Sequence, residues 1–223
     1  ISSSITENAT SISVTLSGSA STSDYEDALK AITFSNSSDD PDTTNRTITI
    51  KINDGTVDSA GAVGTISVVA TNDVPTLDLD ASSDGTRYST NYVEGGSAVE
   101  IADSDIAIAD ADNEPIASAT ITLSNKKTGD VLNIGSLPTG ITASTAEPAN
   151  SIQVTLSGSA TAADYQTAIR ALTFENSQSI PDSTDRVFNI VVNDGTVDSA
   201  VSTTTVLSLI HISEPTRREG ISY

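Results

Sequence analysis

The chain has no cysteine, no tryptophan and, within its 223 residues, a single histidine. The missing cysteine excludes disulfides, thiol chemistry and zinc–thiolate sites, so a secreted domain of this sequence depends on its core, on repetition or on bound metal for stability. Aromatic residues make up only 4% of the chain, so the core must be built mainly from Val, Ile, Leu and Ala. No apolar run approaches the roughly 20 residues of a transmembrane helix, and the first residues do not form a signal peptide, so we expect any export signal to lie outside this sequence.

Positive charge is also scarce, because 10 Lys and Arg stand against 30 Asp and Glu, which gives a net charge of −20. Of the acidic residues, 21 are Asp and 9 are Glu, and Asp is typical of turns and of loops that bind cations. This charge argues against nucleic acid and against contact with an anionic membrane, and it favours bound cations that offset self-repulsion. The alternative is that the acidic residues only keep the surface soluble.

The residues of most catalytic sites are missing as well. Without cysteine, and with His211 in a segment that we set aside below, nucleophilic triads and thiol chemistry are excluded. A pair of carboxylates, as in glycoside hydrolases, is the remaining option, but few aromatic residues are present to build a cleft that stacks on sugars. We therefore expect that the protein is not an enzyme.

What the chain does have is a long internal repeat. Residues 11–60, SISVTLSGSASTSDYEDALKAITFSNSSDDPDTTNRTITIKINDGTVDSA, return at 151–200 as SIQVTLSGSATAADYQTAIRALTFENSQSIPDSTDRVFNIVVNDGTVDSA, with 30 of 50 positions identical and no gap. The offset of 140 positions is the size of a whole domain rather than of a solenoid rung or a propeller blade. We therefore predict a tandem array, with the C-terminal part of one repeat at 1–73 and a near-complete second repeat at 74–206.

Apolar residues alternate with Ser and Thr in most of each copy, which predicts half-buried β-strands. One short helix interrupts them, because Ser21 with Asp24, and Thr161 with Asp164, have the spacing of a capping box. The sequence NDGTVDS ends the strongest strand of each copy and indicates a hairpin. We predict an all-β fold of antiparallel sandwiches, each with one short helix, and exposed strand edges in the incomplete first copy. The residues expected to face the core of the second sandwich are Ile121, Leu123, Ile152, Val154, Leu156, Phe188, Ile190 and Val192.

Several motifs together resemble a known family. They are ATNDVPTLDLDA, YVEGGSAVEIADSDIAIADAD, SATITLSN, LPTGITAS, VTLSGSATAADYQTAIRALTF and VVNDG. In this order they resemble the cadherin-like repeats, with an Ig-like sandwich, of giant bacterial surface adhesins. The resemblance implies an extracellular protein of the bacterial cell surface that serves cell adhesion and biofilm formation. Its partners would be neighbouring repeats of the same chain, and host or surface ligands would be bound through other domains.

The resemblance also implies Ca²⁺ at the junction between consecutive domains. Its acidic elements follow one another as in cadherins: a linker, an early Glu and then Asp-x-Asp. The residues at these places are Asn72, Asp73, Glu94, Asp110 and Asp112. Calcium requires six to eight oxygen ligands, and an Asp-x-Asp pair in a turn can direct two carboxylates at one ion.

Other acidic residues are weaker candidates. Asp78 with Asp80, and Asp103 with Asp105, repeat the same spacing and are expected to be solvated, whereas Asp194 and its counterpart Asp54 are expected to stabilise hairpin turns. The sequence thus favours a calcium-stiffened spacer. The alternative is an accessory module that binds glycan or protein within a secreted multidomain protein or enzyme.

The last segment, 207–223, resembles neither copy. LSLIHISEPTR, followed three residues later by Ile-Ser-Tyr, resembles the translation of a transposase sequencing adapter, so we interpret the segment as a non-native tail. Its first residues are apolar enough to extend a closing strand. The register of the first copy places Val206 and Ser208 inward in that strand, and we expect no packed structure beyond about Ser213.

Overall fold

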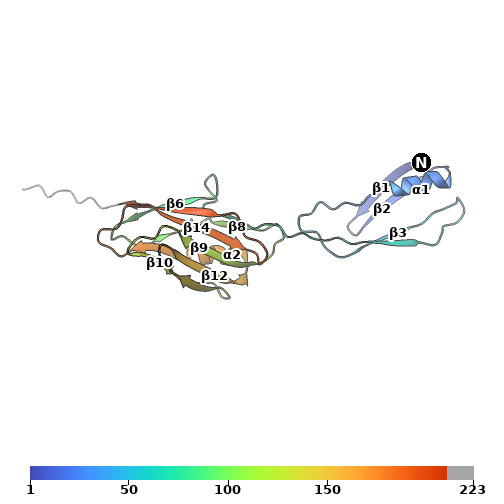
Figure 1. Ribbon diagram of the computed structural model, residues 1–223. Coiled ribbons are helices and arrows are strands. Elements are labelled where there is room, and N and C mark those ends of the chain that lie inside the picture. The colour runs from blue at the N-terminus through green and yellow to red at the C-terminus, as the bar shows by residue number, and fades with distance from the viewer. Residues whose placement is uncertain (210–223) are drawn as a thin grey trace, which may run out of the picture. The chain divides into compact units, whose positions relative to one another are not determined.

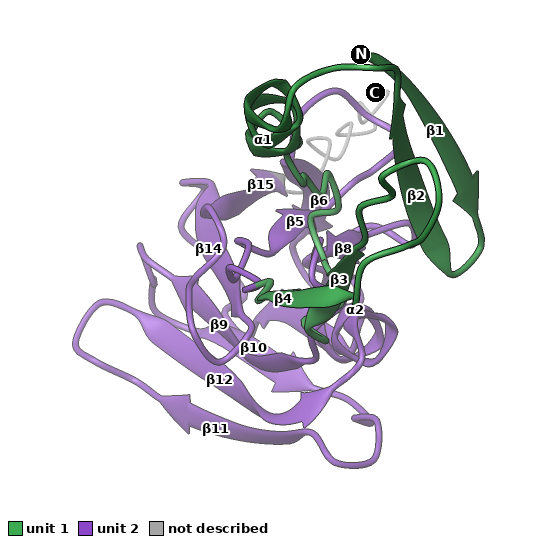
Figure 2. Cartoon of the chain, turned by 90° about the vertical axis from the view of Figure 1, so that its right-hand side faces the viewer, with its two compact units in different colours: residues 1–68 green, residues 69–223 purple. Residues whose placement is uncertain are grey.

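The computed structural model of the chain describes residues 1–209. Contacts divide the chain into two compact units, unit 1 at Ile1–Val68 and unit 2 at Val69–Tyr223 (Figure 2). The described residues contain fifteen strands and two helices, which confirms the all-β prediction. Neither helix is long and apolar enough to cross a membrane.

Unit 2 is built from eleven strands and one helix (Figure 1). In chain order they are β5 Thr76–Asp78, β6 Tyr88–Val93, β7 Val99–Glu100, β8 Ala107–Ala109, β9 Ile116–Leu123, β10 Asp130–Ile134, β11 Thr142–Ala146, β12 Ile152–Ala160, α2 Ala162–Arg170, β13 Leu172–Asn176, β14 Arg186–Asn193 and β15 Ser202–Leu209. Six strands form one sheet in the order β11-β12-β9-β14-β15-β6. A second sheet has the order β10-β13-β7, and β5 pairs with β8.

The two larger sheets face each other as in a β-sandwich. Phe174 of β13 packs edge-on against Tyr92 of β6 and Phe188 of β14, at ring-centroid distances of 5.5 and 5.8 Å. The eight residues predicted to face the core are all buried, with exposed fractions of 1% or less. The alternation of apolar and small polar residues therefore identified the buried face correctly, because successive side chains of a strand point to opposite sides of a sheet.

One strand pair differs from the predicted antiparallel arrangement. β6 runs parallel to β15, with Thr204 opposite Tyr88 and Leu209 opposite Val93. All other strand pairs of the described part of unit 2 are antiparallel. A parallel pair requires a long connection instead of a hairpin, and here almost the whole of unit 2 lies between the two strands.

Helix α2 begins where the capping box was predicted. The Thr161 hydroxyl accepts a hydrogen bond from the Asp164 N–H at 3.1 Å, and the Asp164 carboxylate accepts from the N–H and hydroxyl of Thr161. Tyr165, Ala168 and Ile169 are buried on one face of the helix, which packs against β8, β9, β12 and β13. The cap thus sets the start of the helix, and its apolar stripe sets the side that enters the core.

A buried ion pair joins β10 to β14 in unit 2. Arg186 Nε donates to Asp130 Oδ2 at 2.6 Å, and both side chains are almost fully buried. Asn176 donates to the other oxygen of Asp130, and the backbone carbonyls of Asp182 and Thr184 accept from Arg186. Every charge is matched by hydrogen bonds, and removal of one partner from such a pair typically costs about 3–5 kcal/mol.

Unit 1 consists of two hairpins and a helix. Its elements are β1 Ser2–Asn8, β2 Ser11–Ser17, α1 Thr22–Lys30, β3 Arg46–Ile50 and β4 Ala62–Ile66. β1 pairs only with β2, and β3 only with β4, in two separate two-stranded sheets. The pairings match those of unit 2 at the offset of the repeat, since Ser2 lies opposite Ser17 and Thr142 opposite Ser157.

The equivalent apolar residues of unit 1 are exposed. Ile12 is 62% exposed where Ile152 is 1% exposed, and Phe34 is 42% exposed where Phe174 is 2% exposed. None of the residues of α1 is buried, although its capping box is formed as in α2. The apolar faces of unit 1 are therefore not covered by other described residues.

The closing strand β15 extends into the segment that resembles an adapter. Val206 is buried, Ser208 is half-buried and Leu207 is 37% exposed. This orientation is the one that the register of the first copy predicted. The expectation for the chain beyond Ser213 lies outside the described residues.

Candidate metal-binding sites

The linker residues Asn72 and Asp73 lie at the start of unit 2 and contact two of its loops. The backbone N–H of Asp73 donates to the carboxylate of Asp112. The side-chain amide of Asn72 donates to Asp194 Oδ2 at 2.9 Å. With Asp110, these residues are called the linker cluster below, and they comprise four carboxylates and one amide.

The acidic turn between β8 and β9 presents Asp110 and Asp112. Asp112 N–H donates to Asp110 Oδ1 at 2.9 Å, and Asn113 N–H donates to the Asp110 carbonyl at 3.2 Å. Asn113 closes the turn with a φ of 55°, a left-handed conformation that Asn adopts more readily than most residues. The turn thus places the Asp112 carboxylate against the linker and ties the Asp110 carboxylate to the same turn, on the Asp-x-Asp spacing that the sequence indicated.

One carboxylate oxygen of Asp110 bears directly on whether the cluster could hold a cation. Its Oδ2 is buried and has no hydrogen-bond partner among the described residues. A buried carboxylate oxygen without a donor costs free energy, roughly 1–3 kcal/mol or more for a charged group. A cation at this position would satisfy the oxygen, and in this respect the residues fit a calcium ion.

Asp194 was predicted to stabilise its hairpin, and it does so. Its Oδ1 accepts hydrogen bonds from the N–H groups of Thr196 and Val197 at 2.6 and 2.8 Å. Gly195 follows with a φ of 104°, which favours glycine. Burial acts to raise the pKa of Asp194, but the hydrogen bonds from Asn72, Val197 and Thr196 outweigh it and lower the pKa below its usual value. The sequence did not indicate that this residue also reaches the linker.

Glu94 is the one predicted ligand that the structure places elsewhere. It directly follows β6, whose last residue Val93 lies opposite Leu209 at the end of β15. The linker cluster lies near the other end of β15, at the hairpin that precedes Ser202. The seven steps along β15 correspond to about 23 Å, so Glu94 and the linker cluster lie at opposite ends of unit 2.

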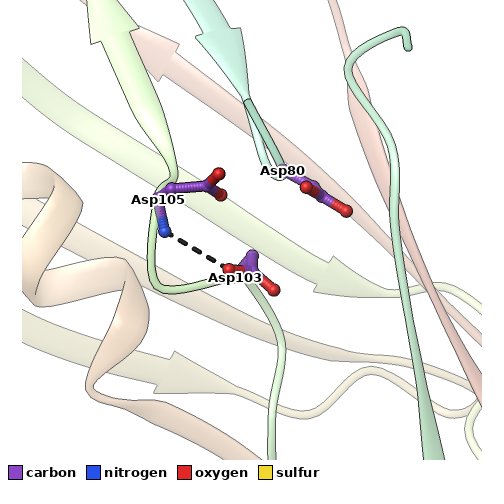
Figure 3. A group of neighbouring side chains, drawn as sticks. All are labelled: Asp80, Asp103 and Asp105. Atoms are coloured by element: carbon purple, nitrogen blue, oxygen red, sulfur yellow. Dashed lines mark hydrogen bonds between the residues drawn. The ribbon is translucent and has the colours of Figure 1, made fainter. Parts of the chain in front are cut away.

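A second acidic group forms where weaker candidates meet. Carboxylate oxygens of Asp80, Asp103 and Asp105 lie within 4.8 Å of one another, and they are the only such group of three among the described residues (Figure 3). The Asp103 N–H donates to the carbonyl of Leu79 at 2.9 Å, which holds the two segments together. A hydrogen bond from the Ser104 hydroxyl lowers the pKa of Asp103 and keeps it charged. The sequence showed two separate Asp-x-Asp pairs and gave no sign that Asp80 would meet the second one.

Unit 2 also has a shallow hollow of about 550 Å³ beside Asp110. Its described lining residues are Ile108, Ala109, Asp110, Asn113, Glu114, Pro115, Ser159, Ala160, Thr161 and Ala162. None of them is aromatic, so the hollow lacks the flat side chains on which sugars stack. Its charged lining residues, Asp110 and Glu114, belong to the acidic segment between β8 and β9.

Comparisons with known proteins do not identify a family for this chain. No protein-family model matches the chain. No curated protein matches it either.

Proposed function

We propose that this chain is a calcium-stiffened spacer of a large bacterial cell-surface adhesin, made of tandem cadherin-like repeats. In this role the repeats hold an adhesive part of the protein away from the cell, and Ca²⁺ acts on the joint between consecutive domains. The observation that carries the proposal is Asp110 Oδ2, a buried and unpartnered carboxylate oxygen beside the linker. The internal repeat and the net charge of −20 support it, because an acidic array repels itself unless cations are bound.

The linker residues would hold the ion together with the acidic turn. Asp110 and Asp112 supply carboxylate oxygens from a fixed turn, and Asn72 and Asp73 supply oxygens from the segment that leads out of unit 1. Calcium with these ligands would tie the linker to unit 2. A bound divalent cation supplies charge neutralisation and a fixed coordination geometry, and both restrict the swing of one domain against the next.

The test is thermal unfolding of the full chain with calcium and with a chelator, at equal ionic strength. Extracellular modules bind calcium with dissociation constants of about 10⁻⁴ to 10⁻³ M. At about a hundred times its dissociation constant, calcium stabilises the folded state by about 2.7 kcal/mol. For a unit of this size we therefore expect the melting temperature to rise by about 5–10 °C.

Two matched double variants locate the site. Asp110→Asn with Asp112→Asn should remove most of the calcium effect, whereas Asp103→Asn with Asp105→Asn should leave most of it. Both pairs remove two negative charges from loops of unit 2, so general charge repulsion changes equally. An equal response of wild type and the first variant to calcium would contradict the assignment of the ion to the linker cluster.

A further inference from the structure

Among the described residues, the outer face of the large sheet of unit 2 carries no charged side chain. Its six strands, β11, β12, β9, β14, β15 and β6, contain a single charged residue, Arg186. Arg186 is 2% exposed and lies on the inner face, where it pairs with Asp130. The acidic residues of unit 2 that the structure describes therefore lie outside this sheet, although the chain has a net charge of −20.

Strand alternation and register define this outer face. In β9, β12 and β14, the inward residues are buried and alternate with half-buried residues that point to the other side of the sheet. At the middle of the sheet, the pairing of β9 with β12 and β14 brings six of these outward side chains together. They are Thr120, Thr122, Gln153, Thr155, Asn189 and Val191. The outward side chains of the six strands, centred on this group, are called the neutral face below.

The first copy of the repeat keeps these positions almost free of charge while it changes their residues. Ser13 stands where the second copy has Gln153, at the offset of 140 positions. Among the equivalents of the outward residues in the first copy, only Lys51, in the place of Val191, is charged. The absence of charge at these positions therefore matters more than the identity of each side chain.

The composition of the neutral face decides which partner it can accept. Its described residues include no carboxylate to hold a cation and no Lys or Arg to hold an anion. They include no outward aromatic ring for a sugar either, since Tyr92 of β6 is buried and Tyr88 packs against the core. Two copies of an acidic chain repel each other where acidic surfaces meet. Contact through two neutral faces avoids this repulsion.

The area of the neutral face is sufficient for a weak, specific interface. Six strands about 4.8 Å apart span about 25 Å, and strands of five to nine residues span roughly 17–30 Å. The face therefore measures about 500 Å² in projection on each copy, or about 1,000 Å² for two copies, which is the lower limit for specific protein interfaces. Its β-branched Thr and Val side chains have few rotamers to lose on contact.

We propose that the neutral face is a docking surface for a second copy of this chain, with the two large sheets packed face to face. Sheets in such contacts align their strands within about 30° of each other. The inference goes beyond the proposed spacer, because calcium would act on the joints along one chain, whereas the neutral face joins chains side by side. None of the six central residues belongs to the linker cluster.

Sedimentation equilibrium of the full chain, in chelator, tests the association. For an interface of this size we expect a weak dimer, with a dissociation constant of about 10⁻⁴ M. Added salt should tighten the dimer, because it screens the repulsion between the acidic surfaces of the two copies. An association held by ion pairs would weaken instead, which would contradict docking through the neutral face.

Two variants of opposite sign locate the contact at the centre of the neutral face. Thr122→Glu and Thr122→Arg each bury an unpaired charge in the interface, so both should weaken the dimer by at least about 100-fold. If net charge alone governed association, Thr122→Arg would strengthen it.

Thr173→Glu and Thr173→Arg are the matched controls. Thr173 is a half-buried residue of β13 on the outer side of the second sheet, where it lies opposite Glu100. A charge at this position lies outside the neutral face, so both variants should leave the dissociation constant unchanged. Thermal melting of all four variants shows whether the fold is intact.

NMR of the isotope-labelled wild-type chain gives a second readout that needs no variant. As the concentration of the chain rises, the amide signals of β9, β12 and β14 should shift, because these strands carry the centre of the contact. The amide signals of β10 and β13, in the second sheet, should not shift.

Three outcomes would overturn the proposal. Equal association of wild type and both Thr122 variants would place the contact elsewhere, such as on the exposed apolar residues of unit 1. A chain that stays monomeric at about ten times the expected dissociation constant, without shifted signals, would show that the face has no affinity for a second copy. Signals of β9 that shift with a neutral polysaccharide such as dextran, but not with the concentration of the chain, would identify a glycan as the occupant. Because every measurement is made in chelator, the failure of this inference and the failure of the calcium site are distinguishable.

Discussion

Single residues of the same type have different roles in the two copies. Ile50 and Ile190 occupy equivalent positions in the repeat, yet Ile50 is 39% exposed and Ile190 is fully buried. The transfer free energy of a side chain depends on the surface removed from water, which the residue type alone does not determine. The two copies therefore offer a matched comparison of one side chain in two environments.

We expect Ile190→Ala to lower the free energy of unfolding of unit 2 by about 2–5 kcal/mol, because it removes buried methyl groups and leaves a cavity. Ile50→Ala in the same chain should cost well under half as much. Denaturant unfolding of the two variants, with strand-specific NMR signals for each unit, measures both costs. Equal costs would mean that Ile50 is covered in solution.

Tyr165 is the residue whose ionisation couples most clearly to folding. It is fully buried, its hydroxyl donates to the Gly158 carbonyl at 2.8 Å, and burial raises its pKa to about 12. In the unfolded chain a tyrosine ionises near pH 10. The contribution of Tyr165 is therefore fully present below pH 10 and is lost as the pH rises from 10 towards 12.

We predict that the stability of unit 2 falls more steeply above pH 10 in wild type than in Tyr165→Phe. Below pH 10 the variant should be less stable by about 1 kcal/mol, because it lacks the hydrogen bond to Gly158. Urea unfolding at a series of pH values between 8 and 11.5 gives both slopes. Parallel slopes for the two proteins would show that Tyr165 titrates normally.

At the level of elements, helices and hairpins form by local rules that are the same in both units. Both helices have a complete capping box, and both NDGTVDS hairpins have the same Asn-to-Asp side-chain bond, at 2.7 Å. These interactions join residues a few positions apart, so they need no distant partner. What differs is the packing around them, since α2 has a buried face and α1 has none.

Removal of the cap should therefore have different consequences in the two helices. Thr161→Ala should lower the stability of unit 2 by about 1 kcal/mol, because it leaves an N–H of the first turn without its acceptor. Ser21→Ala should instead lower the local helix content of α1 with little effect on unit 2. Denaturant unfolding measures the first change, and amide exchange across α1 measures the second.

At the scale of the whole molecule, charge and repetition govern the behaviour that we propose. The chain has a net charge of −20. Its second unit carries two acidic groups, the linker cluster and the group formed by Asp80, Asp103 and Asp105. Calcium at the linker would neutralise part of this charge where consecutive domains join. The mechanical effect would be on the angle between domains more than on either core.

A protein of two complete repeats should therefore become more extended when calcium is added. Small-angle scattering should show a larger radius of gyration with calcium than with chelator, and Asp110→Asn with Asp112→Asn in the second repeat should abolish most of the difference. Magnesium at the same ionic strength serves as the control for simple screening. A radius of gyration that is the same in calcium and in chelator would show that the carboxylates are only a solvated surface.

The sequence by itself determined the alternating strands β9, β12 and β14, the capped helix, the NDGTVDS hairpin and the buried face of unit 2. Alternation placed Phe188, Ile190 and Val192 inward, because a period of two is a property of the extended chain and requires no knowledge of its neighbours. The repeat also predicted where unit 1 would lack cover. These are local patterns, and local patterns are visible in a single sequence.

Only the tertiary structure decided which distant residues meet. It placed Asp80 beside Asp103 and Asp105, brought Asp194 to Asn72, and separated Glu94 from the other predicted ligands by the length of β15. It also paired Arg186 with Asp130 across 56 positions of the chain. Such contacts depend on the order and direction of strands in the sheets, and packing of whole faces sets that order, which no short stretch of sequence encodes.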